Sequence, residues 1–384
     1  MTSLEEAVRQ IGVSVAGPAA DDVDRHARFP IEALTALKKA RLLSAFVPKE
    51  LGGMGCGISE LSGMCELLGR YCSASGMVLA MHHIQVACLV RHGLSQESGR
   101  RYLAELAERQ LLIASVTSEV GVGGDTRTSV CALERTGGLF ALTKDATTIS
   151  YGEHADDLLI TARRASDAQG NDQLLVLARK GEYTLQRKGN WDTLGMRGTC
   201  SPGFLLTCSG SVDQILPTPF AEISSQTMVP FSHILWAGLW LGIATAGVTR
   251  ARAFVREQAR RTPGVAPPSG VRLAELWSAL QAMRSNVHAV ATECDALMAS
   301  SEGAEALSSL RFALEMNNLK VIASTQVVQI IHQALLICGI SGYKNDTKFS
   351  LGRQLRDAHS AALMVGNDRI LATNASLLLV LKEE

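Results

Sequence analysis

The chain has 384 residues, of which 47% are hydrophobic and 19% charged, and its 37 Lys and Arg residues are balanced by 37 Asp and Glu residues. A chain of this length can bury a large core, and its lack of net charge argues against binding to nucleic acid or to an anionic membrane. The nine cysteines are odd in number and show no zinc-ligand spacing, so we expect reduced core thiols in a cytoplasmic protein and no metal site.

Residues 1–113 are expected to form an N-terminal helical domain. Apolar side chains recur here at positions i, i+3, i+4 and i+7, as at Leu61, Met64, Cys65 and Leu68. The first residues include acidic side chains and no long apolar run, so we expect no signal peptide.

Residues 114–216 are expected to form a middle β domain. Apolar runs of strand length lie at 139–142, 158–161 and 174–177, and they are bounded by Gly, Asp or Asn. Short runs with turn signals at this spacing predict a small antiparallel barrel or sandwich.

Residues 217–384 return to helical periodicity and are expected to form a C-terminal helical bundle. The apolar run 234–248 is shorter than the ~20 residues that span a bilayer, so we interpret it as a helix buried within the bundle. Gly242 and Ala244 would let another helix approach it closely. Helices, then strands, then helices predict an α+β fold.

Three segments of the β region carry ligand-binding signals. The glycine-rich turn from Ser118 to Asp125 lets backbone N–H groups approach a planar or anionic ligand, although an ordinary hairpin turn has the same pattern. Ser150 ends an expected strand and can offer its hydroxyl to a ring nitrogen, although a Thr/Ser-rich edge strand is the commoner meaning. The third segment, 191–201, is a polar loop with one aromatic residue.

In this order and spacing, the segments resemble the acyl-CoA dehydrogenase superfamily, and the resemblance extends over nearly the whole chain. It is carried by the opening helices and loop at 29–55, the flavin loop with Ser118, Glu119, Gly121, Gly123 and Asp125, the strand with Ile149 and Ser150, the loop 194–199, Arg260, the pair Gly339 and Gly342, and the segment 355–358. Each motif is weak alone, and together they are specific.

The resemblance implies an FAD cofactor, with FMN less expected, bound between the subunits of a homotetramer or homodimer. It implies a helical N-terminal domain, a middle β-barrel and a C-terminal four-helix bundle. The residues that it assigns to the cofactor are Ser118, Gly123, Gly124, Ile149, Ser150, Arg260, Gly339, Gly342 and Asn367.

The chain departs from the family pattern at the catalytic base. In the dehydrogenases that it resembles, a Glu removes a proton from the acyl thioester while a hydride passes to the flavin, and Val365 stands at that position here. Some members hold the base at the start of the first C-terminal helix, where this chain has Ser232 and His233. Thr148 replaces a Trp that shields one flavin edge, and Gly124 replaces a Ser near the flavin.

Three residues are candidates for a relocated base. His233 titrates in a range suited to that task. His83, with His82 beside it, lies on a helix whose family counterpart faces the active site, although a core histidine is the commoner meaning. Asp368 lies one helical turn beyond Val365, although the helix dipole also favours acids at helix starts.

Three hypotheses follow. The first is an FAD-dependent dehydrogenase with a relocated base, which oxidises a CoA-linked or carrier-protein-linked acyl thioester and passes electrons to an electron-transfer flavoprotein. The second is a monooxygenase, in which flavin reduced by a flavin reductase reacts with O₂ to give a C4a-hydroperoxyflavin. That chemistry needs space and dryness rather than a carboxylate base. The third is a family member without catalysis, because a fold alone does not determine a function.

Overall fold

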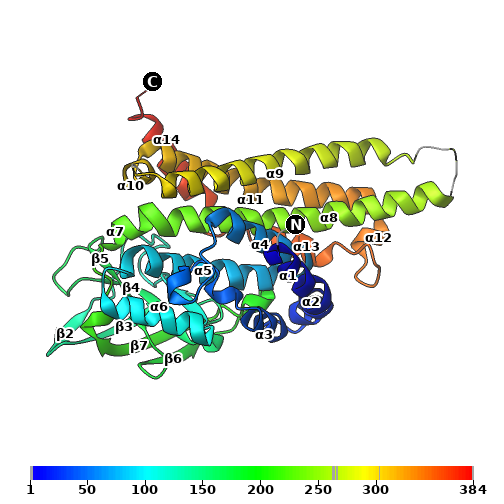
Figure 1. Ribbon diagram of the computed structural model, residues 1–384. Helices are drawn as coiled ribbons and strands as arrows, with labels where there is room; N and C mark the ends of the chain where they lie inside the picture. The colour runs from blue at the N-terminus through cyan, green and yellow to red at the C-terminus, as the bar shows by residue number, and fades with distance from the viewer. Residues whose placement is uncertain (1–2, 262–263, 265–266, 302, 383–384) are drawn as a thin grey trace.

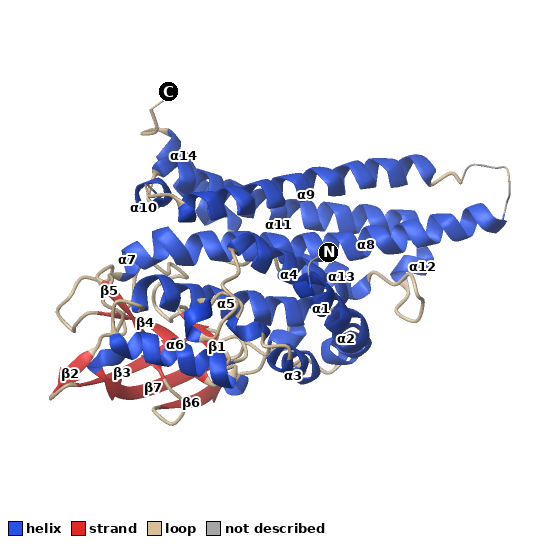
Figure 2. Ribbon diagram, in the orientation of Figure 1, coloured by secondary structure: helices blue, strands red, loops and turns tan. Residues whose placement is uncertain are grey.

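The structure is a computed structural model that describes residues 3–261, 264, 267–301 and 303–382 (Figure 1). The strands gather at one side of the molecule below α5 (Ser73–Gly93) and α6 (Glu97–Arg109), and long helices run across the opposite side (Figure 2). This arrangement of helices, strands and helices along the chain confirms the expected α+β fold class.

The N-terminal region is helical, as its periodicity predicts. Its other α-helices are α1 (Ser3–Ile11), α2 (Gly17–Arg25), α3 (Ile31–Lys39) and α4 (Ile58–Tyr71). Helix α5 is buried along almost its whole length, polar side chains included, because it lies between the strands and the long C-terminal helices. Side chains on α5 therefore meet other parts of the protein on every side.

The middle region contains two sheets. The four-stranded sheet is antiparallel in the order β2 (Glu134–Thr136), β3 (Leu139–Ala146), β7 (Gly203–Ser211) and β6 (Tyr183–Lys188). The second sheet has the order β1 (Ile113–Val116), β4 (Asp157–Arg163) and β5 (Gln173–Ala178). Here β1 pairs parallel with β4, so the expectation of purely antiparallel pairing is wrong at this strand. Parallel pairing needs a long crossover connection, and the chain between β1 and β4 supplies it by building β2 and β3.

The C-terminal region is built on three long helices that run side by side (Figure 1). These are α8 (Val229–Arg261), α9 (Gly270–Ala299) and α11 (Leu310–Cys338), and the shorter helices are α7 (Phe220–Ile223), α10 (Gly303–Leu307), α12 (Ile340–Tyr343), α13 (Gly352–His359) and α14 (Asn367–Leu378). A π-helical turn, Ser224–Met228, joins α7 to α8. The apolar run 234–248 is buried within α8, which confirms its interpretation as a core helix.

Three described helical segments, Ser73–Gly93, Phe220–Arg261 and Leu310–Cys338, have the length and apolar composition of a membrane-crossing helix. Protein packing covers 89% and 100% of the apolar window in the first two, and 44% in the third. The first two are therefore core helices of this fold, while one side of α11 is open.

Helices α4 and α8 cross with their backbones nearly in contact. A Cβ atom placed on Gly242 of α8 would lie 2.2 Å from the backbone carbonyl oxygen of Glu66 on α4. A Cβ on Gly69 of α4 would lie 2.7 Å from the carbonyl oxygen of Leu239. The expected role of Gly242 in close helix approach is confirmed.

Candidate functional site

A cavity of about 620 Å³ lies between α5, the β region, the loop 191–201 and the start of α8. Its helical wall is rich in thioethers, with Met77, Met81 and Met228 among the lining residues. A second cavity of about 670 Å³ adjoins it, since His233 and Val365 line both. The two cavities place the start of α8 and the segment before α14 at the centre of the candidate site.

The β wall of the first cavity is lined by hydroxyl groups. Thr148, Ser150 and Ser201 line it, and the Ser201 hydroxyl donates a hydrogen bond of 2.9 Å to the Ser150 hydroxyl. Ser118 does not line the cavity, and its hydroxyl donates to the Thr148 carbonyl at 2.7 Å and accepts from the Thr148 N–H at 3.1 Å. Ile149 is fully buried, and its N–H donates to the Pro202 carbonyl. Of these predicted cofactor residues, only Ser150 presents its side chain to the cavity.

Arg369 of α14 holds the glycine-rich turn in place. Gly123 and Gly124 adopt left-handed φ angles of 57° and 79°, which glycine adopts at little cost. The Arg369 guanidinium donates to both of their carbonyl oxygens, at 2.6 Å to that of Gly123. A Cβ atom on Gly124 would lie 3.3 Å from the guanidinium nitrogens. Glycine in place of the serine that the resemblance predicts therefore leaves room for Arg369.

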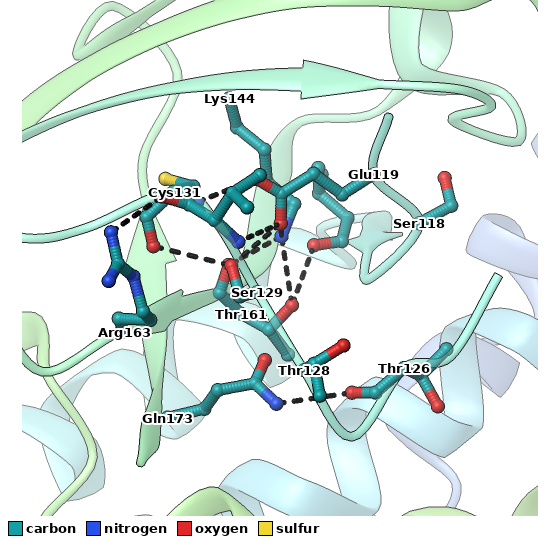
Figure 3. A network of polar contacts seen from close by, with 12 residues as sticks. Ser118, Glu119, Thr126, Thr128, Ser129, Cys131, Lys144, Thr161, Arg163 and Gln173 are labelled. Atoms are coloured by element: carbon teal, nitrogen blue, oxygen red, sulfur yellow. Dashed lines mark hydrogen bonds and ion pairs between the residues drawn. The ribbon is translucent and has the colours of Figure 1, made fainter. Parts of the chain in front are cut away.

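A buried ion pair anchors the other end of this turn (Figure 3). The Glu119 carboxylate accepts from the Ser129 hydroxyl and the Cys131 N–H, each at 2.6 Å, and lies 3.2 Å from the Lys144 ammonium. Lys144 also donates to the Thr161 carbonyl at 2.7 Å. Burial lowers the pKa of Lys144, and the Glu119 charge opposes that shift. The turn is thus tied to two strands by groups that are out of contact with water.

Lys144 was not predicted as a site residue, although the sequence carries a signal for it. In β3 the inward-facing positions alternate with exposed ones, and Phe140, Leu142 and Ala146 are buried on one face. Lys144 has the same parity, so it must enter the interior. A lysine at an inward position needs a buried acid, and Glu119 is that acid.

His233 occupies the position expected of a residue that contacts a ligand. It lines both cavities, and its Nδ1 donates to the Met316 carbonyl at 2.9 Å, which directs Nε2 as the acceptor. Burial lowers its pKa to about 4, the Met316 hydrogen bond opposes this, and the Lys320 charge adds to it. His233 is therefore a neutral hydrogen-bond acceptor at neutral pH.

The other two candidate bases lie outside the cavities. His83 has no exposed surface, its Nε2 donates to the Leu42 carbonyl at 3.1 Å, and it lines neither cavity. His82 is equally buried and bonded to Leu43, so the expectation that one of this pair faces the site is wrong. The packing of α5 against other elements on all sides is the reason. Asp368 is exposed in the first turn of α14 and lines neither cavity, as the helix-dipole alternative predicts.

Val365 lines both cavities at the position where the resemblance predicts a catalytic Glu. Its φ of 61° is left-handed, a strained conformation for a β-branched residue, and Gly366 follows with a φ of 69°. Ser232 also lines the first cavity. Among the described residues that line that cavity there is no Asp or Glu. The first cavity therefore offers a bound substrate no carboxylate base, and the Asp125 carboxylate in the wall of the second cavity is paired with the Arg127 guanidinium.

Asn367 is turned toward α11 rather than toward the cavities. Its side-chain oxygen accepts from the Lys320 ammonium at 2.7 Å, and its amide nitrogen donates to the Ser324 hydroxyl at 3.0 Å. Lys320 has no exposed surface and lies 6.0 Å from the centre of the Trp240 ring. Asn367 thus fixes the segment that carries Val365 onto α11.

The buried ammonium of Lys320 predicts a pH dependence of stability. Burial lowers the pKa of Lys320 to about 8, whereas a lysine in the unfolded chain has a pKa of about 10.4. Between these values the unfolded chain binds more protons, so the free energy of unfolding rises with pH through this window. Urea denaturation at several pH values should show wild-type protein gaining stability relative to Lys320→Met above about pH 8. A difference that stays constant across the window would contradict the assignment.

Three predicted cofactor residues lie at the end of α8 and at α12, and these elements are at the opposite end of the long helices from α7 (Figure 1). Arg260 is 27 residues from His233 on the same helix (260 − 233), which corresponds to about 40 Å. Gly339 is open, with no atom within 4 Å of an added Cβ, whereas one on Gly342 would lie 2.7 Å from the Cys338 side chain. Within one chain, the described structure cannot bring Arg260 to the cavity. Its predicted role requires a second copy of the chain.

Comparison with known proteins assigns both helical regions to one family. The family model of the acyl-CoA dehydrogenase N-terminal domain matches residues 2–137, and that of the C-terminal domain matches residues 225–376. Mitochondrial isovaleryl-CoA dehydrogenase of Solanum tuberosum is 25% identical over 379 residues, which cover 96% of this chain and 87% of that protein.

Proteins with other activities are equally similar. Amino sugar nitrososynthase DnmZ of Streptomyces peucetius is 26% identical over 358 residues, which cover 89% of this chain and 84% of that protein. The solved structure of a dibenzothiophene monooxygenase from Paenibacillus sp. A11-2 matches with a TM-score of 0.79 at 18% identity, covering 98% of this chain and 95% of that one. The overall likeness therefore leaves the reaction open, and the residues of the site must decide it.

Proposed function

Because the chain belongs to the acyl-CoA dehydrogenase family of flavin-dependent oxidoreductases, we propose that it is a flavin monooxygenase rather than an acyl-thioester dehydrogenase. The observation that carries the proposal is the wall of the first cavity, where Val365 stands in place of the catalytic acid. α-Proton abstraction needs a base with a pKa near the working pH. Oxygen transfer needs a dry, spacious site instead.

Neither histidine of the cavity supplies the missing base well. Burial lowers the pKa of His233 to about 4, so the imidazole holds a proton poorly at neutral pH. His359 also lines the cavity but is exposed to solvent. Water therefore competes with a bound substrate for hydrogen bonds to the ring nitrogens of His359.

The residues of the cavity fit a flavin. An isoalloxazine ring is flat and has hydrogen-bonding atoms along one edge. The β wall of the cavity offers hydroxyl groups to such an edge, those of Thr148 and Ser150. The adjacent turn exposes backbone at Gly123, where an added Cβ would meet nothing within 4 Å. We propose FAD as the flavin. Arg260 of a second subunit would contact its far end, because the Arg260 of the same chain is too distant from the cavity.

When bound and reduced, the flavin supplies the two electrons that activate O₂. One oxygen atom enters the substrate and the other leaves as water, with two protons taken up. We propose that a separate flavin reductase supplies the electrons, because the first cavity has no carboxylate base with which to oxidise an acyl substrate. The hydroxyl wall would hold the flavin ring, the methionine-rich wall would limit water beside it, and His233 would present a neutral hydrogen-bond acceptor to the substrate.

Rapid mixing of the reduced, FAD-loaded protein with O₂ tests this function. We expect a transient absorbance band that precedes the return of the oxidised-flavin spectrum. The matched experiment adds a panel of acyl thioesters to oxidised protein without oxygen, and we expect the flavin to stay oxidised. Direct reoxidation without a transient, together with bleaching by a thioester, would support the dehydrogenase instead. Bleaching abolished by His233→Asn but retained by Asp368→Asn would then identify the relocated base. Failure to bind flavin would leave the non-catalytic hypothesis.

A further inference from the structure

Two polar side chains in the wall of the first cavity have no partner for a buried atom. Gln85 of α5 is 2% exposed and lines the cavity, and its amide makes no hydrogen bond to any described residue. Trp236 of α8 is 7% exposed and also lines the cavity, and its indole N–H has no described partner. Buried polar groups are nearly always paired, so an unpaired group in a residue that lines a cavity is a candidate for pairing with a ligand.

The cavity that this pair lines carries little charge and has an apolar helical side. Met77, Met81 and Met228 line the same cavity. Arg356 is the only Lys, Arg, Asp or Glu among the described lining residues, and its guanidinium is already bonded to Asp24 and to the Leu194 carbonyl. A charged substrate would therefore lose its hydration without gaining a counter-ion. A neutral substrate would not.

We propose that Gln85 and Trp236 determine substrate specificity by hydrogen bonding to a hydroxyl group on an otherwise apolar, ring-sized substrate. A hydroxyl can donate to the amide oxygen of Gln85 and accept from the indole N–H of Trp236. A cavity of about 620 Å³ accommodates a ring system of this kind beside a flavin. This inference rests on the proposed function, because it names the substrate class of the same site.

Calorimetry with two matched probes tests the proposal. 1-Naphthol carries the hydroxyl, and 1-methylnaphthalene has a methyl group in its place. The quantity measured is the ratio of the two dissociation constants, because the ratio removes the shared hydrophobic contribution. From wild type to Gln85→Leu, we expect the preference for 1-naphthol to fall about tenfold, and Trp236→Phe should lower it as well.

The matched control is Trp240→Phe. Trp240 also has an unpaired indole N–H, but it does not line the cavity, so its replacement should leave the ratio unchanged. Gln85→Leu should unfold at the same temperature as wild type or at a higher one, because the unpaired amide is removed and no hydrogen bond is lost. A residue with a structural role would instead lower the unfolding temperature.

Three results would overturn the proposal: a ratio that stays within about twofold in both variants, a change of equal size in Trp240→Phe, or no binding of either probe to the wild type. The titrations are made on flavin-free and on FAD-loaded protein and need no turnover. A failed oxygen experiment with an altered ratio would therefore reject the monooxygenase reaction and retain the hydroxyl-binding pair. An absorbance transient in the oxygen experiment together with an unaltered ratio of dissociation constants would retain the monooxygenase reaction and reject the hydroxyl-binding pair.

Discussion

Lys144→Met is expected to lower the free energy of unfolding by about 3–5 kcal/mol, because it leaves the Glu119 carboxylate buried without its cation. Lys144 has no exposed surface, and the Glu119 side chain is 2% exposed, so water cannot replace the lost partner. The hydrogen bonds of Glu119 to Ser129 and Cys131 remain in the variant, but they do not neutralise the charge. Urea denaturation followed by circular dichroism measures the loss.

Lys188→Met is the matched control for this prediction. Lys188 lies in the same sheet and pairs with Asp145 at 2.6 Å, but its side chain is 50% exposed. Exposed pairs of this kind contribute about 0–1 kcal/mol. The double variant Glu119→Gln with Lys144→Met should lose less than the sum of the single variants, because no unpaired charge remains. Equal losses for Lys144→Met and Lys188→Met would show that the buried pair has no special weight.

Gly242→Ala is expected to lower the free energy of unfolding by at least about 1–3 kcal/mol, because the new methyl group has no space at the α4–α8 crossing. Its Cβ would lie 2.2 Å from the Glu66 carbonyl oxygen, and a backbone atom cannot move aside as a flexible side chain can. The two helices must therefore separate. Thermal and urea denaturation both report the resulting loss.

The control for Gly242 lies on the partner helix. An added Cβ on Gly63 of α4 would meet nothing within 4 Å, so Gly63→Ala should raise stability by up to about 1 kcal/mol through helix propensity. Opposite signs for the two substitutions would locate the effect at the crossing. A Gly242→Ala protein as stable as wild type would show that the helices can adjust their separation.

Local pattern determined the element types and the order of the motifs. Helical periodicity predicted α4 and the buried stretch of α8, and Gly242 was recognised as a helix-contact residue, because these properties depend on the side chains of one segment. The loss of the family Glu at Val365 was also readable, since it needs only alignment of neighbouring residues. The family therefore followed from the sequence alone.

Long-range contacts decided which polar residues belong to the site. His82 and His83 are ordinary helix residues by pattern, and only packing on all sides of α5 makes them core residues. The same packing places Gln85, two positions further along α5, on the cavity wall.

The sequence by itself thus determined the fold class, the family and the absence of the usual catalytic acid, because these depend on periodicity and on motif order. Only the tertiary structure decided that Glu119 meets Lys144, that Arg369 holds Gly124, and how β1 pairs. Each of these contacts joins segments that are far apart in the chain. Their partners are set by the packing of whole elements, and no local pattern records that packing.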